Sequence, residues 1–218
     1  MKHYRLPHID QAVETVILAN GKFPSHPIPL SILKKASYIV CCDGAVNNLS
    51  ETAIEPDAIV GDCDSLSEKN KDRFATILHP VTEQDTNDLT KAVNFCIDQG
   101  RKDIVILGAT GKREDHTIGN ISLLCEYMKC ANVEMISDHG CFVATDEEAS
   151  FESMKGQQIS IFCLDQTLVS SQNLLYQIQN QIFSNWWQAT LNEATNNQFI
   201  VKSSGRTIVC RNFLQAEY

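Results

Sequence analysis

Residues 104–136 read IVILGATGKREDHTIGNISLLCEYMKCANVEMI and contain a complete strand–helix–strand unit. The apolar runs at 104–107 and 133–136 are typical of buried parallel strands, which are covered on both faces. Between them, apolar residues recur with the spacing of one helix face. That stripe comprises Ile118, Ile121, Leu124, Cys125 and Met128. The unit therefore predicts a parallel sheet with crossover helices.

The same alternation extends toward the N-terminus. Further strands are expected at Thr15–Ala19, Tyr38–Cys42 and Ala58–Val60. A second amphipathic helix is predicted over Leu89–Ile97, where Gly100 supplies a stop. Residues 1–140 are thus predicted to form an α/β domain, a doubly wound, mainly parallel sheet with helices on both faces.

After residue 138 the pattern changes to short β-type runs separated by polar or glycine-containing turns. These runs are Cys141–Ala144, Ile159–Cys163, Leu174–Ile178, Gln198–Lys202 and Thr207–Cys210. They predict a small antiparallel β-sandwich over residues 141–218. Trp186 and Trp187, if on a strand, would point to opposite faces, so at most one belongs to the core.

Composition excludes several classes of protein. The chain has 218 residues, of which 43 % are apolar, and its net charge is −9, so we expect no general attraction to nucleic acid or to anionic membranes. No apolar run approaches the roughly 18 residues of a membrane helix, and the polar start resembles no secretory signal. None of the nine cysteines forms a Cys-x-x-Cys pair. We therefore expect free thiols and a cytoplasmic location.

Carboxylates follow the predicted strands at four places. Asp43, the pair Asp62 and Asp64, the pair Asp85 and Asp88, and Asp115 each come after an apolar run. Ligands of doubly wound folds bind beyond the carboxyl ends of the strands, so these acids are expected at one edge. Alternatively, each aspartate on its own is a turn former or a helix N-cap.

Two of these segments carry more specific chemistry. Asp62 and Asp64 can both reach one hard cation, and Mg²⁺ prefers a few carboxylates together with substrate phosphates. The loop Gly108–Gly111 lies between a strand and a helix, where backbone N–H groups can approach phosphate oxygens. The guanidinium of Arg113 could donate two parallel hydrogen bonds to a phosphate. Lys91 either meets a phosphate or pairs with Asp88. His116 and Asn120 are one helical turn apart and can both face the cleft, although His116 could simply stabilise the helix start.

Taken together, the four segments resemble those of thiamine pyrophosphokinases of the bacterial type. The resemblance rests on Asp43-Gly44-Ala45-x-Asn47, on Gly61-Asp62-x-Asp64-Ser65, on Gln84-Asp85-Thr86-x-Asp88-x-x-Lys91, and on Gly108-x-x-Gly111-x-Arg113-x-Asp115-His116-x-x-x-Asn120. It implies a homodimeric enzyme that uses ATP and Mg²⁺ to convert thiamine into thiamine diphosphate and AMP.

The resemblance also implies roles for individual residues. Asp62, Asp64 and Asp88 would hold Mg²⁺, Arg113 would stabilise the transferring group, and Asp115 would orient or deprotonate the thiamine hydroxyl. The nucleotide site would comprise Asp43, Gly44, Asn47, Lys91, Gly108, Gly111, Arg113 and His116. Thiamine would contact Gln84, Asp115, Asn120, Tyr176 and Asn192.

Other functions stay open at this point. A Mg²⁺-dependent phosphatase could use Asp62 as its nucleophile, and a non-catalytic sensor of thiamine or nucleotide could use the same acids only for binding. A dinucleotide-dependent oxidoreductase is more remote, because the glycine pattern lacks a third glycine.

Overall fold

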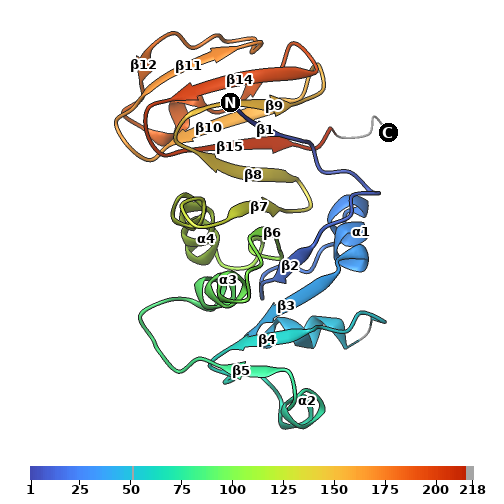
Figure 1. Cartoon of the computed structure of the whole chain (residues 1–218). Coiled ribbons are helices and arrows are strands. Elements are labelled where there is room, and N and C mark those ends of the chain that lie inside the picture. The colour runs from blue at the N-terminus through green and yellow to red at the C-terminus, as the bar shows by residue number, and fades with distance from the viewer. Residues whose placement is uncertain (51, 215–218) are drawn as a thin grey trace. The chain divides into compact units, whose positions relative to one another are not determined.

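The computed structural model describes residues 1–50 and 52–214. Its contacts divide the chain into one unit formed by His8–Asp138 and a second unit formed by Met1–Pro7 together with the residues from His139 onward. The two units are described separately (Figure 1). Within the described residues, no helix is long and apolar enough to cross a bilayer.

The first unit is built on a parallel sheet in the order β7-β6-β2-β3-β4-β5. Its strands are β2 (Thr15–Leu18), β3 (Tyr38–Cys42), β4 (Ala58–Gly61), β5 (Leu78–Pro80), β6 (Asp103–Leu107) and β7 (Asn132–Ile136). Its helices are α1 (Pro27–Lys35), the 3-10 helix η1 (Asp43–Leu49), α2 (Glu68–Arg73), α3 (Asp88–Asp98) and α4 (Glu114–Tyr127). Figure 1 shows α3 and α4 on one side of this sheet and α1 on the other.

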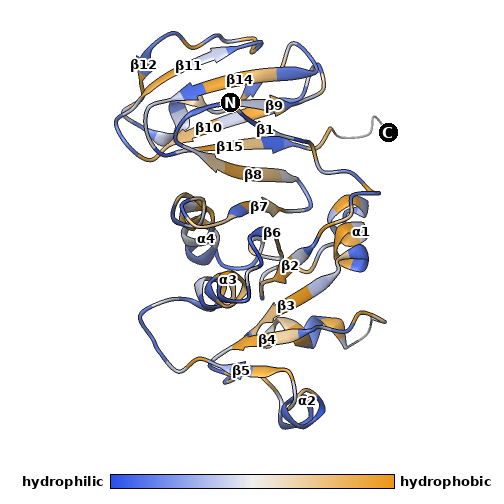
Figure 2. Cartoon of the chain, viewed as in Figure 1, coloured by the Kyte–Doolittle hydropathy of each residue, from blue (hydrophilic) through white to orange (hydrophobic). Residues whose placement is uncertain are grey.

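Strands that are buried along their whole length show that the sheet is covered on both faces. Every residue of β2 and β4 is buried, and both strands are predominantly apolar (Figure 2). The chain proceeds from β2 outward to β5 and then returns to place β6 on the other side of β2. The strand order therefore reverses between β2 and β6, and this is the position where doubly wound sheets open a crevice for ligands. The predicted fold class is confirmed.

The two predicted helices, α3 and α4, follow the sequence signals with one exception, whereas α1, η1 and α2 have no counterpart among the predicted helices. Asn87 caps α3 by accepting a hydrogen bond from the Thr90 N–H at 2.9 Å, and Gly100 ends the segment with a φ of +76°. On α4, however, the prediction that Ile118 is buried is wrong, because this side chain is 56 % exposed. Asn120, Leu124 and Tyr127 face inward instead.

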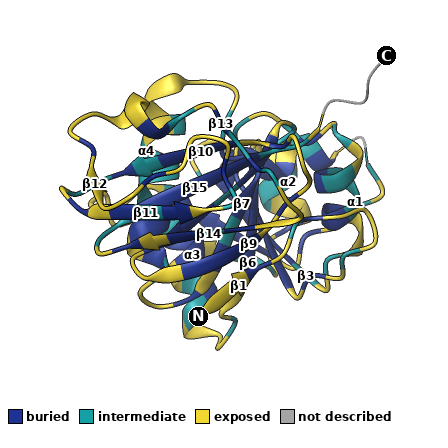
Figure 3. Ribbon diagram, turned by 90° about the horizontal axis from the view of Figure 1, so that it is seen from above, coloured by how far each residue is buried: buried dark blue, intermediate teal, exposed yellow. Residues whose placement is uncertain are grey.

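The second unit is a sandwich of two sheets. One has the order β1-β9-β14-β11-β12, and the other contains β13-β10-β15-β8. Its elements are β1 (Lys2–Tyr4), β8 (Gly140–Thr145), β9 (Glu148–Glu152), β10 (Gln158–Cys163), β11 (Leu168–Gln172), β12 (Gln181–Ile182), the 3-10 helix η2 (Trp186–Ala189), β13 (Asn192–Glu193), β14 (Gln198–Ser203) and β15 (Thr207–Asn212). All pairings are antiparallel except that of β1 with β9. Dark blue strands and yellow connections distinguish buried from exposed segments in Figure 3.

Three aromatic rings form the centre of the sandwich. Phe151 stacks against Tyr4 at 5.1 Å and against Phe199 at 5.0 Å between ring centroids. The hydroxyl of Tyr4 donates to the carbonyl of Ala144 at 3.0 Å. The first residues of the chain are thus part of this core, which no sequence pattern indicates.

Two predictions for the sandwich are wrong. Residues 174–178 do not form a strand; Asn173, with a φ of 63°, ends β11, and only an isolated bridge joins Leu174 to Ala194. Trp186 and Trp187 do not lie on a strand either, but on η2, which begins with a capping box between Asn185 and Gln188. Both indoles are exposed.

Candidate active site

Asp43 lies at the end of β3 and is the most deeply buried of the candidate carboxylates. Its side chain is 3 % exposed, and its φ of 35° lies in the left-handed region that side chains rarely adopt. Oδ2 accepts a hydrogen bond from the Ser65 N–H at 3.1 Å, whereas Oδ1 is buried without a hydrogen-bond partner. A buried, unpaired carboxylate oxygen is costly, and strained backbone of this kind is concentrated at functional sites.

The loop after β4 lies against Asp43. A Cβ at Gly61 would come within 2.7 Å of the Asp43 Cβ, so only glycine allows this approach. Asp62 Oδ1 accepts from the Asp64 N–H at 3.1 Å, and Cys63 between them has a φ of 64°. Burial raises the pKa of the Cys63 thiol, and the charges of Asp43 and Asp62 raise it further. This loop therefore carries several negative charges within a short distance.

Asp88 opens α3 and faces the same group of charges. Burial raises its pKa, Lys91 opposes that shift, and the charges of Asp43 and Asp62 add to it. Lys91 is almost completely buried, and its Nζ lies 3.4 Å from Asp88 Oδ1. The sequence left open whether Lys91 meets a phosphate or pairs with Asp88, and in the structure it pairs with Asp88.

The carboxylates are close enough to interact, but they are not arranged as a finished metal site. Across the described part of the chain, no three His, Cys, Asp or Glu side chains form a group that could hold a metal ion. The donor set nevertheless fits a hard cation: Asp43, Asp62 and Asp88 interact electrostatically, and Asp43 Oδ1 has no other partner. A bound cation would offset the repulsion between these carboxylates and would give Asp43 Oδ1 a partner.

The glycine loop after β6 is closely packed against the segment after β2. The N–H of Gly21 donates to the carbonyl of Gly108 at 2.6 Å, and the N–H of Lys22 donates to that of Thr110 at 2.8 Å. A Cβ at Gly21 would meet the Gly108 oxygen at 2.2 Å, and Gly111 has a φ of 85°. Both glycines are therefore required by the local geometry, at the switch point between β2 and β6.

The segment Asn20-Gly21-Lys22 is missing from the sequence-based candidates. Lys112 Nζ donates to the carbonyl of Asn20 at 3.1 Å, and a Cβ at Gly44 would lie 2.9 Å from Asn20 Nδ2. The segment therefore borders two of the predicted loops. A signal was present, since a polar Asn-Gly-Lys directly follows the apolar run Thr15–Ala19.

Arg113 and Asp115 form an exposed, two-pronged ion pair at the start of α4. Arg113 Nε donates to Asp115 Oδ1 at 3.1 Å and its Nη2 donates to Oδ2 at 2.5 Å. Arg113, with help from the backbone N–H of His116, lowers the pKa of Asp115 to about 2. In this pairing Asp115 is a weak proton acceptor, so a role as general base requires Arg113 to turn toward another anion.

The predicted asparagines hold loops together. Asn47 Nδ2 donates to the carbonyl of Ser65 at 3.2 Å, which connects η1 with the loop after β4. Asn120 Nδ2 donates to the carbonyl of Ala109 at 2.9 Å, and its Oδ1 accepts from Asn87 Nδ2 at 3.1 Å. Asn120 is 8 % exposed, so its amide points into the protein rather than toward a substrate.

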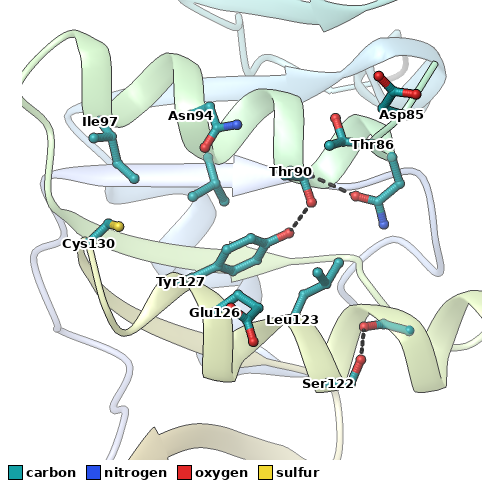
Figure 4. A pocket seen from close by; sticks show the side chains of 13 residues that line it. Asp85, Thr86, Thr90, Asn94, Ile97, Ser122, Leu123, Glu126, Tyr127 and Cys130 are labelled. Atoms are coloured by element: carbon teal, nitrogen blue, oxygen red, sulfur yellow. Dashed lines mark hydrogen bonds between the residues drawn. The ribbon is translucent and has the colours of Figure 1, made fainter. Parts of the chain in front are cut away.

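A groove of about 550 Å³ runs between α3 and α4 (Figure 4). Val93, Ile97 and Leu123 supply apolar walls, and Tyr127 crosses the groove to reach Thr90. The groove shares the loop 85–87 with the candidate site, but Asp43, Asp62 and Asp64 do not line it. We therefore place the charged chemistry at the strand ends and not in this groove. Gln84 lies exposed on the same loop.

In the sandwich, Asn192 holds the backbone of Tyr176. Its Oδ1 accepts from the Tyr176 N–H at 3.0 Å, and its Nδ2 donates to the Tyr176 carbonyl at 2.7 Å. Asn192 is buried, whereas the ring of Tyr176 is 67 % exposed. Six large apolar side chains between residues 175 and 191 remain exposed, namely Leu175, Tyr176, Ile182, Trp186, Trp187 and Leu191.

Residues 30–136 match the family model of the thiamin pyrophosphokinase catalytic domain, and residues 140–210 match that of the thiamin pyrophosphokinase substrate-binding domain. Thiamin pyrophosphokinase 1 of Caenorhabditis elegans is 29 % identical over 195 residues, which are 82 % of this chain and 80 % of that protein. Thiamine pyrophosphokinase of Bacillus subtilis is 35 % identical over 91 residues, 40 % of this chain and 42 % of that protein.

Solved structures show the same fold. Thiamin pyrophosphokinase from Candida albicans has a TM-score of 0.79 at 19 % identity, covering 98 % of this chain and 93 % of its own. The crystal structure of thiamine pyrophosphokinase from Bacillus subtilis has a TM-score of 0.76 at 21 % identity, covering 93 % and 100 %. At these identities the likeness extends to the fold alone.

Proposed function

The chain belongs to the thiamin pyrophosphokinase family, and we propose that its own strand-end carboxylates carry out the transfer of the pyrophosphoryl group of ATP to thiamine. The products are thiamine diphosphate and AMP. The thiamine hydroxyl attacks the β-phosphorus, the bond between the α- and β-phosphates breaks, and the hydroxyl proton is released. Such a transfer depends mainly on positioning and on neutralisation of charge.

The observation that carries this proposal is the unpaired oxygen of Asp43 among other carboxylates. Asp43 Oδ1 is buried, and the charges of Asp43 and Asp62 add to the burial that raises the pKa of Asp88. We propose that Asp62, Asp64 and Asp88 hold Mg²⁺, with Asp43 as an additional candidate. A cation held there would supply positive charge that offsets the negative charge developing during the transfer.

The nucleotide would lie along the glycine loop and the neighbouring strand ends. Because Gly108 and Gly111 lack side chains, this loop can pack closely against Ala19 and Lys22. Backbone N–H groups of such a loop can bind phosphate oxygens. Gly44 and Asn47 would line the same edge, as would His116 at the start of α4. Asn20, Gly21 and Lys22 join this set, because they contact the glycine loop or border Gly44.

Arg113 is proposed to bind the transferring group. Its guanidinium already donates two hydrogen bonds to the Asp115 carboxylate and is largely exposed. A phosphate could therefore accept these two hydrogen bonds in place of Asp115. Release of Arg113 would raise the basicity of the Asp115 carboxylate and free it to accept the thiamine proton or to orient the hydroxyl. Lys91, buried beside Asp88, would limit repulsion within the acidic group.

Thiamine is proposed to contact Gln84 and Tyr176, with Asn192 as the residue that fixes the Tyr176 backbone. An exposed aromatic ring suits both the flat pyrimidine and the cationic thiazolium. The exposed apolar residues 175–191 support a second proposal, that the protein acts as a homodimer. None of the nine cysteines is in a disulfide, which supports the proposal that the protein acts in the cytoplasm.

The test is an assay of AMP formation. Wild-type protein should release AMP only when ATP, Mg²⁺ and thiamine are all present, and EDTA should abolish the reaction. Asp64→Asn should lose most activity, whereas Asp98→Asn, the same change at the far, exposed end of α3, should be active. Inorganic phosphate released without thiamine would instead indicate a phosphatase, and binding without turnover would indicate a sensor.

A further inference from the structure

The side chain of Asn120 joins two loops of the candidate site. Its Nδ2 donates to the carbonyl of Ala109 in the glycine loop at 2.9 Å. Its Oδ1 accepts from Nδ2 of Asn87, the N-cap of α3, at 3.1 Å. Asn120 is buried on α4; its hydrogen bond to Ala109 is buried, and its hydrogen bond with Asn87 is partly buried. One amide thus connects the loop after β6 with the start of α3.

The connection continues into the first turn of α3. Asn87 Oδ1 accepts from the Thr90 N–H at 2.9 Å, so the Asn87 side chain is held at both ends. Asp88 is the next residue in the chain and is one of the proposed metal ligands. A fixed Asn87 therefore restricts where the Asp88 carboxylate can lie relative to Gly108–Gly111.

The two helices do not depend on this amide to stay together. Thr90 Oγ1 and the hydroxyl of Tyr127 are hydrogen-bonded at 2.8 Å farther along the groove (Figure 4). Leu89, Leu124 and Tyr127 also supply buried apolar contacts along these helices. Removal of the Asn120 amide should therefore change the geometry of the loops without separating α3 from α4.

We propose that Asn120 is a positioning residue that sets the distance between the glycine loop and the Asp88 carboxylate, acting through Asn87. The proposal rests on the proposed function of Asp88 as a metal ligand. Groups that orient metal ligands from outside are commonly worth about 10- to 100-fold in metal affinity or activity. The same size of effect is expected here.

Two variants break the connection at different points. Asn120→Ala removes both hydrogen bonds. Asn87→Ser keeps an oxygen that can cap α3, but a serine is too short to reach Asn120. Asn132→Ala is the matched control, because it removes a side-chain hydrogen bond of 3.0 Å to Asp103 at the opposite end of the strands.

The measurement is Mn²⁺ binding by calorimetry with an ATP analogue whose α,β-bridge is a methylene group, together with kcat and both KM values. Asn120→Ala and Asn87→Ser should weaken Mn²⁺ binding about 10-fold or more and lower kcat. The KM for thiamine should change less than twofold. Asn132→Ala should match wild type, and the double variant should be no worse than Asn120→Ala because both act through one bond.

Three results would overturn the proposal. Wild-type Mn²⁺ affinity in both variants would show that the amide does not position Asp88. A raised KM for thiamine with normal Mn²⁺ binding in Asn120→Ala would make Asn120 a substrate ligand. Equal losses in Asn132→Ala would indicate general destabilisation. Failure of the proposed function is recognised separately, because wild type itself would then form no AMP from ATP and thiamine.

Discussion

Substitution of Asp43 by asparagine should make the protein more stable and less active at the same time. The amide oxygen of asparagine can still accept the hydrogen bond from Ser65, which Asp43 Oδ2 accepts at 3.1 Å. The charge that interacts with Asp88 is removed, and so is the unpaired carboxylate oxygen. The metal-free protein should therefore gain stability, whereas the active enzyme loses a candidate ligand.

The magnitude follows from the buried oxygen. An unsatisfied buried polar group costs about 1–3 kcal/mol, and a charged one costs more. Asparagine replaces the unpaired carboxylate oxygen by an uncharged NH₂ that also lacks a partner, so we expect only the difference, roughly 1–2 kcal/mol, to be recovered. For a chain of this length, about 1 kcal/mol shifts Tm by roughly 2–4 °C. The Tm of Asp43→Asn in EDTA should thus rise by about 2–8 °C.

Bound metal should reverse the order of the Tm values of wild type and Asp43→Asn. A ligand present at about 100 times its Kd stabilises the folded state by about 2.7 kcal/mol, so Mg²⁺ with an ATP analogue should raise the Tm of wild type and leave that of Asp43→Asn nearly unchanged. Thermal unfolding followed by circular dichroism, with and without Mg²⁺, measures both effects. Asp57→Asn is the control, because Asp57 Oδ2 also accepts a backbone hydrogen bond, from Ile39 at 2.7 Å, but at the amino end of β4. A lower Tm for Asp43→Asn in EDTA, or an undiminished response to Mg²⁺, would refute the reasoning.

Further tests address the other groups. Asp64→Asn should reduce kcat at least about 100-fold with a normal circular dichroism spectrum, since Asp64 lies on an exposed loop; near-normal turnover would contradict its role as a metal ligand. Tyr176→Ala should raise the KM for thiamine about 10-fold, whereas a change in the KM for ATP alone would exclude a thiamine contact. Carbon-13 NMR titration should find the pKa of Asp115 near 2, so that this ion pair is formed above pH 4 and lost as the pH falls through 2. In Arg113→Gln that pKa should rise toward the reference value of about 3.9 but stay below it, because the His116 N–H still donates to Asp115; an ordinary value in wild type would mean that the pair is absent in solution.

Much of the α/β unit could be predicted because its signals are local. An apolar run of β-branched residues favours a buried strand whatever lies around it, and the stripe of α3 is buried as its spacing predicts, at Leu89, Ala92, Val93 and Cys96. The acids after those runs belong to one edge of the sheet by the geometry of parallel strands. On α4 the spacing correctly predicted the burial of Leu124 and Cys125 but not the exposure of Ile118. It also gave no sign of the burial of Asn120, which depends on partners outside the helix.

The sandwich was harder to predict because its pairings are distant in sequence. Strand β1 pairs with β9, and Tyr4 contacts Phe151, although the whole α/β unit lies between these residues in the sequence. No short window of sequence contains both partners. The exposed position of Trp187 likewise depends on the capping box that makes η2, rather than on strand alternation.

The sequence by itself determined that this chain has a parallel α/β unit with carboxylates at its strand ends, followed by a β-rich unit, because periodicity and strand exits are properties of neighbouring residues. Only the tertiary structure decided which polar groups meet. It places Gly21 against Gly108, leaves Asp43 Oδ1 unpaired, and turns the amide of Asn120 inward. Those outcomes depend on which strands lie side by side in the sheet. Hydrogen bonds and charge interactions act over a few ångströms in space, whatever the separation of the residues along the chain.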